Sequence, residues 1–168
     1  MKMTKRKISV TGLGYVGLPV AIAFAEAQFS VIGFDIDKHR ISNLKNGIDE
    51  TCEVENSRLF NPNITFSSDP KKIKMADFHI VTVPTPVTDK NEPDISFLIN
   101  ASKNIGEQLC DGDIVVYEST VYPGCTEDDC IPVLEQLSSL TAGVDFFVGY
   151  SPERINPGDL SHRLKQFE

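Results

Sequence analysis

The sequence is short of positive charge: its 16 lysine and arginine residues stand against 24 aspartate and glutamate residues, a net charge of −8. A nucleic acid or an anionic membrane surface requires a basic face, so we expect neither as a partner. The deficit does not exclude an anionic cofactor, because a few oriented backbone N–H groups can outweigh distant carboxylates. The 168 residues suffice for one globular domain with its own hydrophobic core.

Metal-binding and disulfide patterns are also absent. The four cysteines (Cys52, Cys110, Cys125 and Cys130) include no C-x-x-C pair, and none of the three histidines has a ligand partner at a suitable spacing. We therefore expect no metal site and no disulfide framework. Free thiols of this kind suit a cytoplasmic protein, which is the location we predict.

The N-terminal region has no convincing secretion signal. Basic residues precede an uncharged run from Ile8 to Ala25, which imitates a signal peptide. That run contains Gly12, Gly14, Gly17 and Pro19, spaced as in a turn between two elements. We interpret the region as a strand, a turn and a helix inside a soluble domain, without membrane insertion.

Short apolar segments alternate with helical patterns along the chain. Strands are predicted at 7–11, 30–35, 64–66, 78–83, 114–117 and 146–149, and helices at 16–27, 38–46, 70–75, 94–109 and up to about residue 140. Residues 48–63 are predicted as a loop, and Gly47 as a helix cap. Repeated β-α-β units imply an α/β fold, a doubly wound, Rossmann-like parallel sheet with helices on both faces. We assign residues 1–150 to a dinucleotide-binding domain and residues 151–168 to a tail leading out of it.

A glycine-rich segment, G-L-G-Y-V-G at residues 12–17, follows the first predicted strand and opens a helix. In such a segment Gly12 permits the tight turn, Gly14 lets a pyrophosphate approach the backbone, and Gly17 lets the helix pack closely on the strand. The helix N-terminus offers unpaired N–H groups and a partial positive charge to the diphosphate. The segment therefore predicts a dinucleotide site.

Asp35 ends the second predicted strand at the distance expected of a ribose-binding acid. Its carboxylate would accept hydrogen bonds from the ribose hydroxyls and repel a 2′-phosphate, which favours NAD over NADP. Arg40 keeps NADP open, since an arginine nearby can accommodate that phosphate. A glycine-rich turn of this shape could also serve FAD or S-adenosylmethionine, or bind nothing.

Three later segments lie just past predicted strands, where doubly wound sheets bind ligands: V-P-T-P at 83–86, E-S-T-V-Y-P-G at 118–124 and Y-S-P-E-R-I-N-P-G-D at 150–159. Taken singly, they could be a rigid turn, a helix entry and a solvated loop. Together with G-L-G-Y-V-G-L-P and F-D-I-D-K-H-R-I, they resemble the N-terminal NAD domain of the UDP-glucose/GDP-mannose dehydrogenase family.

The resemblance extends along essentially the whole chain and is strongest to the branch that oxidises UDP-N-acetylhexosamines, especially the UDP-N-acetylgalactosamine and UDP-N-acetylglucosamine 6-dehydrogenases of surface-polysaccharide synthesis. The UDP-glucose branch more often has S-P-E-F-L-R-E, whose second glutamate is replaced here by Pro157. The family takes a C6 alcohol to a carboxylate with two NAD, through a cysteine thiohemiacetal and thioester. Its full-length members are expected to be homo-oligomers.

The resemblance also implies roles for individual residues. The backbone at Tyr15 and Val16 would hold the pyrophosphate, and Asp35 and Arg40 the adenosine ribose. The nicotinamide half would be lined by Pro84, Thr85, Ser119 and Thr120. Glu153 is a candidate catalytic base beside the sugar, and Arg154 a candidate contact to the UDP-sugar substrate; Thr120 is the second candidate catalytic residue.

Cys125 is a tempting nucleophile but a poor one. A position near a helix N-terminus would lower the pKa of its thiol, whereas Glu127, Asp128 and Asp129 crowd the same turn and oppose a thiolate. The acids have a simpler use, since Thr126 with Asp129 fits a capping box. No histidine lies nearby in the sequence to act as a base.

In the family the nucleophilic cysteine belongs to a later motif with no counterpart in these 168 residues. We therefore expect the chain to bind NAD without completing the oxidation, as the NAD-binding part of a longer enzyme. A stand-alone NAD-binding regulatory module is a second hypothesis. A dehydrogenase of 3-hydroxyacids or 6-phosphogluconate would leave the segments at 83–86 and 118–124 unexplained.

Overall fold

Six apolar segments form one parallel sheet in the order β3-β2-β1-β4-β5-β6. The computed structural model describes residues 5–87 and 92–152. The strands are β1 (Lys7–Thr11), β2 (Ser30–Phe34), β3 (Ile64–Ser67), β4 (Phe78–Val81), β5 (Ile114–Tyr117) and β6 (Phe147–Tyr150). This order, with its reversal between β1 and β4, is that of doubly wound dinucleotide-binding sheets and confirms the predicted fold class.

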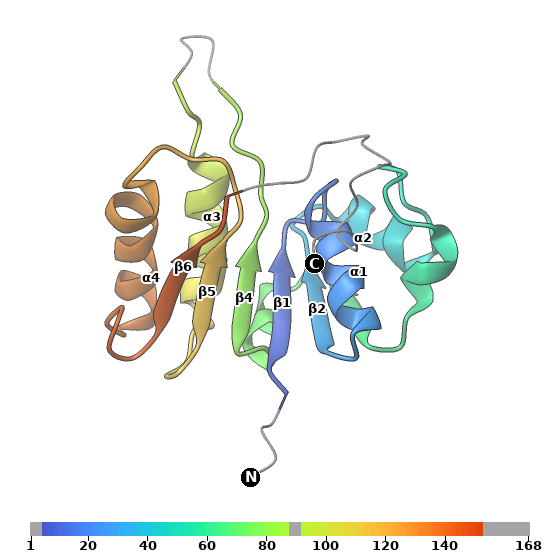
Figure 1. Cartoon of the computed structure of the whole chain (residues 1–168), viewed down its shortest axis with the longest axis horizontal. Helices are drawn as coiled ribbons and strands as arrows, with labels where there is room; N and C mark the ends of the chain where they lie inside the picture. Colours follow the sequence, from blue (N-terminus) through green and yellow to red (C-terminus); the bar gives the residue numbers. More distant parts are fainter. Residues whose placement is uncertain (1–4, 88–91, 153–168) are drawn as a thin grey trace.

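Helices connect the strands and cover the sheet in two groups (Figure 1). The α-helices are α1 (Gly17–Glu26), α2 (Lys38–Lys45), α3 (Ser96–Gly106) and α4 (Ile131–Ser138), and the shorter turns are η1 (Asn56–Phe60), η2 (Pro70–Met75) and η3 (Thr126–Cys130). One hydrophobic core lies between α1, α2 and the β1–β3 half of the sheet, and a second joins α3, α4 and η2 to the opposite face. The sheet is therefore covered from both sides.

Two local expectations were wrong. The stretch 48–63, predicted as a loop, contains the 3₁₀ turn η1, whose Leu59 is buried in the first core. The helix predicted to run to about residue 140 is confirmed as α4, which ends at Ser138 and continues directly from the π-helical turn η3. The capping box does not form, because Cys125 precedes η3 without any side-chain cap, and the Asp129 carboxylate accepts a hydrogen bond from Tyr122 Oη at 2.6 Å.

Helix α2 is held at both ends by side-chain and backbone chemistry. Asp37 Oδ1 accepts a hydrogen bond from the His39 N–H at 2.8 Å and caps the first turn. Gly47 follows the helix with a φ of 75°, which confirms its prediction as the capping glycine. A Cβ at this position would also collide with the Phe60 ring. The end of α2 fixes where the loop that follows it begins.

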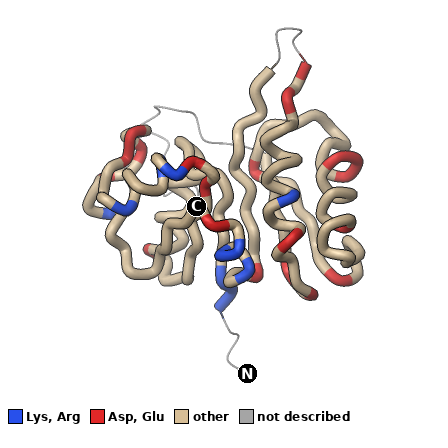
Figure 2. The backbone as a smooth tube through the Cα atoms, turned by 180° about the vertical axis from the view of Figure 1, so that it is seen from behind, with Lys and Arg blue, Asp and Glu red and all other residues tan. Residues whose placement is uncertain are grey.

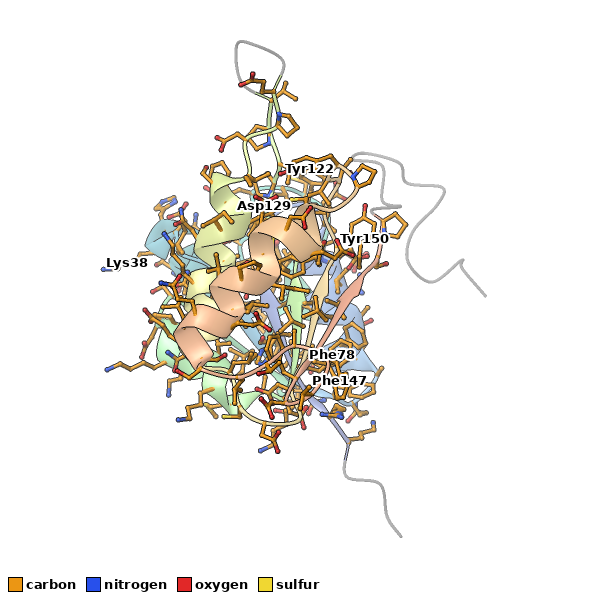
Figure 3. All side chains as sticks on the ribbon, turned by 90° about the vertical axis from the view of Figure 1, so that its left-hand side faces the viewer. Lys38, Phe78, Tyr122, Asp129, Phe147 and Tyr150 are labelled. Atoms are coloured by element: carbon orange, nitrogen blue, oxygen red, sulfur yellow. The ribbon has the colours of Figure 1, made fainter. Side chains whose placement is uncertain are left out.

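The face of β4–β6 that points away from α3 and α4 is covered less well. Phe78, Ile114 and Phe147 lie in one row across the three strands, on the α1 side of the sheet. Phe147 is 50% exposed, and within residues 5–87 and 92–152 no helix packs over it. In Figure 3, Phe78 and Phe147 lie on the same side of the sheet, away from α4, and the strand register places Ile114 between them.

Charge is spread unevenly over the fold. Figure 2 shows acidic residues on η3 and α4, and lysines and arginines gathered near the N-terminal residues and η2. In the part of the chain that the structure describes, no helix is long and apolar enough to cross a membrane.

Candidate cofactor-binding site

Three clefts open side by side at the carboxyl ends of the strands, the edge toward which all arrows point in Figure 1. The central cleft has a volume of about 340 Å³. It is lined by Gly12, Gly14, Tyr15, Val16, Asp35, Thr82, Val83, Pro84, Thr85, Ser119 and Thr120. Nearly all the residues predicted from the sequence as cofactor contacts thus meet in one place. Asp35 lines all three clefts.

The glycine-rich turn has the backbone geometry that a diphosphate needs. Gly12 adopts a φ of 92°, and its N–H donates to Phe34 O at 2.9 Å, which ties the turn to β2. At Gly14 an added Cβ would meet nothing within 4 Å, so the backbone there is open to a ligand. At Gly17 an added Cβ would collide with the Gly12 carbonyl oxygen and the Thr82 hydroxyl.

Helix α1 starts immediately beside the central cleft. Its first intrahelical bond runs from Leu18 N to Gly14 O at 3.1 Å, so the N–H groups of Tyr15 and Val16 precede the helical ladder. Tyr15 is 43% exposed at the rim of the cleft. An open backbone at Gly14 and N–H groups at the start of an α-helix fit an anionic diphosphate.

Asp35 holds the turn and remains available to a ligand. Its Oδ2 accepts the Leu13 N–H at 2.8 Å and its Oδ1 accepts the Asp37 N–H at 2.9 Å. A carboxylate has about four acceptor positions, so each oxygen can still accept a ribose hydroxyl. The side chain is half-buried at the junction of the clefts.

Arg40 lies one cleft away from the glycine-rich turn. It lines the acidic cleft, a depression of about 260 Å³ formed by Leu13, Gly14, Asp35, Asp37, Arg40, Glu50 and Thr51. Its Nε donates to Leu13 O at 2.9 Å, and its Nη2 lies 2.8 Å from Asp49 Oδ1. Arg40 and Asp35 therefore share a cleft, while the guanidinium is engaged by the protein itself.

The loops after β4 and β5 are bound to each other. Thr85 Oγ1 donates to Thr120 O at 2.6 Å, and Ser119 Oγ donates to Val83 O at 2.8 Å. Thr120 is exposed at the cleft, whereas Ser119 is buried and its hydroxyl is directed to the backbone. These hydrogen bonds make one rigid wall from two segments that are about 35 residues apart.

One set of residues at this edge was missed by the sequence reasoning. An apolar cleft of about 350 Å³ lies on the other side of Asp35 and is lined by Thr11, Gly12, Phe34, Asp35, Ile36, Asp37, Val83, Pro84, Phe97, Asn100, Ala101 and Asn104. Ile36 is 65% exposed there. The i, i+3, i+4, i+7 spacing of residues 97, 100, 101 and 104 could have shown a second face of α3, directed at the cleft.

Glu153 and Arg154, the predicted substrate contacts, lie outside the described residues.

Cys125 is buried, and its thiol has a raised pKa. Burial raises the pKa of its thiol, the Tyr122 hydroxyl opposes that effect, and Asp129 adds to it. Burial likewise raises the pKa of Cys130 to about 11, helped by the adjacent Cys125. Both thiols belong to the second hydrophobic core, as expected for small apolar residues.

This combination of strand order, open glycine turn and acid after β2 defines the class of Rossmann-type dinucleotide-binding domains. The family model described as "UDP-glucose/GDP-mannose dehydrogenase family, NAD binding domain" matches residues 6–167. The chain belongs to this family, and NAD is the cofactor of its domain.

Individual relatives agree with that assignment. Protein CapL of Staphylococcus aureus is 55% identical over 160 residues, covering 95% of this chain and 38% of the relative. The UDP-N-acetyl-D-glucosamine 6-dehydrogenase of Salmonella typhi is 53% identical over 159 residues, covering 94% and 37%. The chain thus spans less than two fifths of the length of these relatives.

Solved structures give the same result for the fold. The UDP-D-ManNAc dehydrogenase of Pyrococcus horikoshii superposes with a TM-score of 0.83 at 35% identity, over 90% of this chain and 37% of that one. A ternary complex of GDP-mannose dehydrogenase from Pseudomonas aeruginosa has the same TM-score at 29% identity, again over 90% and 37%.

Proposed function

We propose that this chain is the NAD-binding part of a dehydrogenase that oxidises the C6 alcohol of a UDP-N-acetylhexosamine to a carboxylate. The observation that carries the proposal is the central cleft, where the residues of three separate family segments meet around an open glycine turn. The identity of 53% to a UDP-N-acetyl-D-glucosamine 6-dehydrogenase supports this class of sugar. The place in polysaccharide synthesis is proposed from the family resemblance of the sequence segments.

In this proposal, different parts of the NAD molecule lie in the three clefts. The diphosphate lies at Tyr15 and Val16 in the central cleft, beside the start of α1. The adenosine ribose lies at Asp35, where the clefts meet. The adenine ring occupies the apolar cleft between Ile36 and Phe97, since a flat aromatic base prefers an apolar pocket with a few polar groups.

The nicotinamide end lies at the wall formed by the loops after β4 and β5. Thr85 and Thr120 line it, and Ser119 keeps the wall in place through its bond to Val83 O. The bound cofactor supplies a hydride acceptor there. Thr120, exposed at this end, is the side chain of the described residues best placed to touch the reacting sugar.

The catalytic cysteine of the reaction is proposed to lie outside this chain. A nucleophilic thiol must be accessible and have a lowered pKa, whereas burial raises the pKa values of Cys125 and Cys130. Glu153 as base and Arg154 as sugar contact complete the proposal from the family resemblance. In the whole protein, two successive hydride transfers to two NAD, with one water consumed, balance the oxidation of alcohol to carboxylate.

Calorimetric titration of the chain with NAD and NADP tests the cofactor part of the proposal. We expect measurable affinity for NAD, weaker affinity for NADP, and loss of that preference in Asp35→Ala. Equal affinity of the unmodified chain for the two cofactors would refute the ribose assignment.

NAD reduction, followed by absorbance, tests the catalytic part. The 168-residue chain should bind NAD but reduce none of it with UDP-N-acetylglucosamine or UDP-N-acetylgalactosamine. The same assay on a protein extended to the length of the relatives should give activity with one of these sugars and little with UDP-glucose. Turnover by the short chain would contradict the placement of the nucleophile outside it.

A further inference from the structure

Asp49 organises the loop that follows α2. Its Oδ1 accepts hydrogen bonds from the N–H of Thr51 at 3.0 Å and from its hydroxyl at 2.7 Å. Its Oδ2 accepts the N–H groups of Glu53 at 2.9 Å and Val54 at 3.0 Å. The carboxylate thereby closes residues 49–54 into a compact turn, and this turn brings Glu50 and Thr51 to the acidic cleft.

The same carboxylate binds the Arg40 guanidinium. Nη2 of Arg40 lies 2.8 Å from Asp49 Oδ1, and the two side chains are 9% and 0% exposed. Nε is used by Leu13 O, and Nη1 is buried without a hydrogen-bond partner among the described residues. The cation is therefore held between α2, the glycine-rich turn and the 49–54 loop, and its charge is countered by a carboxylate that no solvent reaches.

The charges around the acidic cleft leave no place for another anion. Asp35, Asp37 and Glu50 line the cleft, and Arg40 is its single lining cation. Because Asp49 balances that cation, the three carboxylates dominate the field at short range. His39 lies 4.0 Å from Glu50, but it is largely exposed and screened by water. A neutral ribose diol suits this field, and a 2′-phosphate is repelled.

We propose that Asp49 is a specificity-determining positioning residue, which keeps Arg40 from serving a 2′-phosphate and thereby makes the domain select NAD over NADP. This inference rests on the proposed placement of the adenosine ribose beside Asp35. Asp35 acts on the cofactor directly, whereas Asp49 acts through Arg40. Removing the charge of Asp49 leaves the Arg40 guanidinium without its buried counter-ion, so the field in the acidic cleft becomes less negative and repels an incoming anion less.

Titration of Asp49→Asn with NAD and with NADP tests the proposal. Asparagine retains the size of the side chain and an acceptor oxygen for the loop, while its charge is lost. We expect the affinity for NADP relative to NAD to rise by at least about tenfold, because the Arg40 guanidinium has lost its buried counter-ion and can attract a phosphate at the 2′ position. The double variant Asp49→Asn/Arg40→Gln should lose that gain, which a loosened loop alone would not predict.

Asp113→Asn is a matched control. Asp113 is also a buried carboxylate that accepts a backbone N–H, from Cys110 at 2.8 Å, but it lies at the opposite edge of the sheet. The ratio of NADP to NAD affinity should be unchanged in this variant. An equal effect of Asp49→Asn on the two cofactors, or a gain that persists in the double variant, would overturn the proposal.

Circular dichroism and urea unfolding establish whether each variant folds. If Asp49→Asn does not fold, Arg40→Gln tests the proposal instead. Because Asp49 already keeps the Arg40 guanidinium from a 2′-phosphate, the ratio of NADP affinity to NAD affinity in this variant should stay within about twofold of that of the unmodified chain. A selective loss of NADP affinity in Arg40→Gln would show that Arg40 is available to the phosphate. An unmodified chain that binds neither cofactor would refute the proposed function, whereas unchanged selectivity in Asp49→Asn with NAD binding intact refutes this inference alone.

Discussion

Thr82 Oγ1 donates a hydrogen bond to Gly12 O at 2.7 Å and so joins the end of β4 to the glycine-rich turn. The hydroxyl lies, together with that carbonyl oxygen, in the space that a Cβ at Gly17 would occupy. The same hydroxyl is 3.1 Å from Thr11 O. One threonine thus fixes the position of the turn relative to two strands, and Gly17 is required because no side chain fits beside it.

Gly17→Ala should therefore disrupt the turn. The new methyl group meets backbone and a buried hydroxyl, and neither can move without shifting β4. We expect the free energy of unfolding to fall by about 1–3 kcal/mol or more, measured by urea denaturation, and NAD affinity to fall with it. Gly14→Ala is the matched control, since its methyl group points into open space. It should fold with near-normal stability but bind NAD weakly; unimpaired binding would contradict the diphosphate placement.

His79 forms the centre of a buried hydrogen-bonded chain at the amino end of β4. Its Nδ1 lies 2.7 Å from Ser9 Oγ and its Nε2 lies 3.3 Å from Asp113 Oδ2. His79→Leu should lower the free energy of unfolding by about 1–3 kcal/mol for each polar group left without a partner. NAD affinity should be unaffected, because the carboxyl edge is not involved.

His39→Leu provides the comparison for that measurement. The His39 side chain is 75% exposed, so its replacement should change the free energy of unfolding by no more than about 0.5 kcal/mol. Equal free energies of unfolding for the two variants would show that the buried hydrogen bonds of His79 do not stabilise the fold.

Thiol labelling distinguishes the four cysteines. Cys52 and Cys110 are exposed, whereas Cys125 and Cys130 are buried with raised pKa values. With Ellman's reagent we expect two thiols to react quickly in the folded chain and the other two only after unfolding. Cys125→Ala should retain NAD affinity. Fast reaction of all four thiols would contradict the burial of the pair beside η3.

The cofactor edge was predictable from sequence where local chemistry decides the structure. The spacing of Gly12, Gly14 and Gly17 indicates a glycine-rich turn, in which Gly12 and Gly17 leave no room for a side chain. Asp35 follows at the distance set by one helix and one strand. These residues were named from spacing alone, and the structure brings Gly12, Gly14 and Asp35 together with Thr120 in one cleft.

What could not be predicted depends on packing between distant or irregular segments. Ile36 and Phe97 are brought together by the register of the strands and the docking of α3, which no local pattern specifies. Asp49 lies in a loop whose sequence has no periodicity, so its ion pair with Arg40 could not be predicted from the sequence. The turn η3 has the same hydrophobic spacing as an ordinary α-helix. The capping box fails because the Asp129 carboxylate accepts a hydrogen bond from Tyr122 instead.

Acid titration gives a last prediction, for Asp49. Burial alone would raise the pKa of this carboxyl group, but hydrogen bonds from Thr51, Val54 and Arg40 outweigh burial and hold the pKa below its ordinary value. A depressed pKa means that Asp49 stabilises the fold at neutral pH and that this contribution is lost as the pH falls through the folded-state pKa. The stability of the unmodified chain should thus decline below about pH 4.

In Asp49→Asn the charge is already absent, so the gap in unfolding free energy between this variant and the unmodified chain should narrow as the pH falls from neutral toward about 3. Urea denaturation at a series of pH values measures the gap. Asp94→Asn is the control: the pKa of Asp94 is also lowered, by hydrogen bonds from Ser96, but this carboxylate is accessible to water, which screens its charge, so we expect little change with pH. A gap for Asp49→Asn that stays constant across the series would mean that the ionised carboxylate does not stabilise the 49–54 loop.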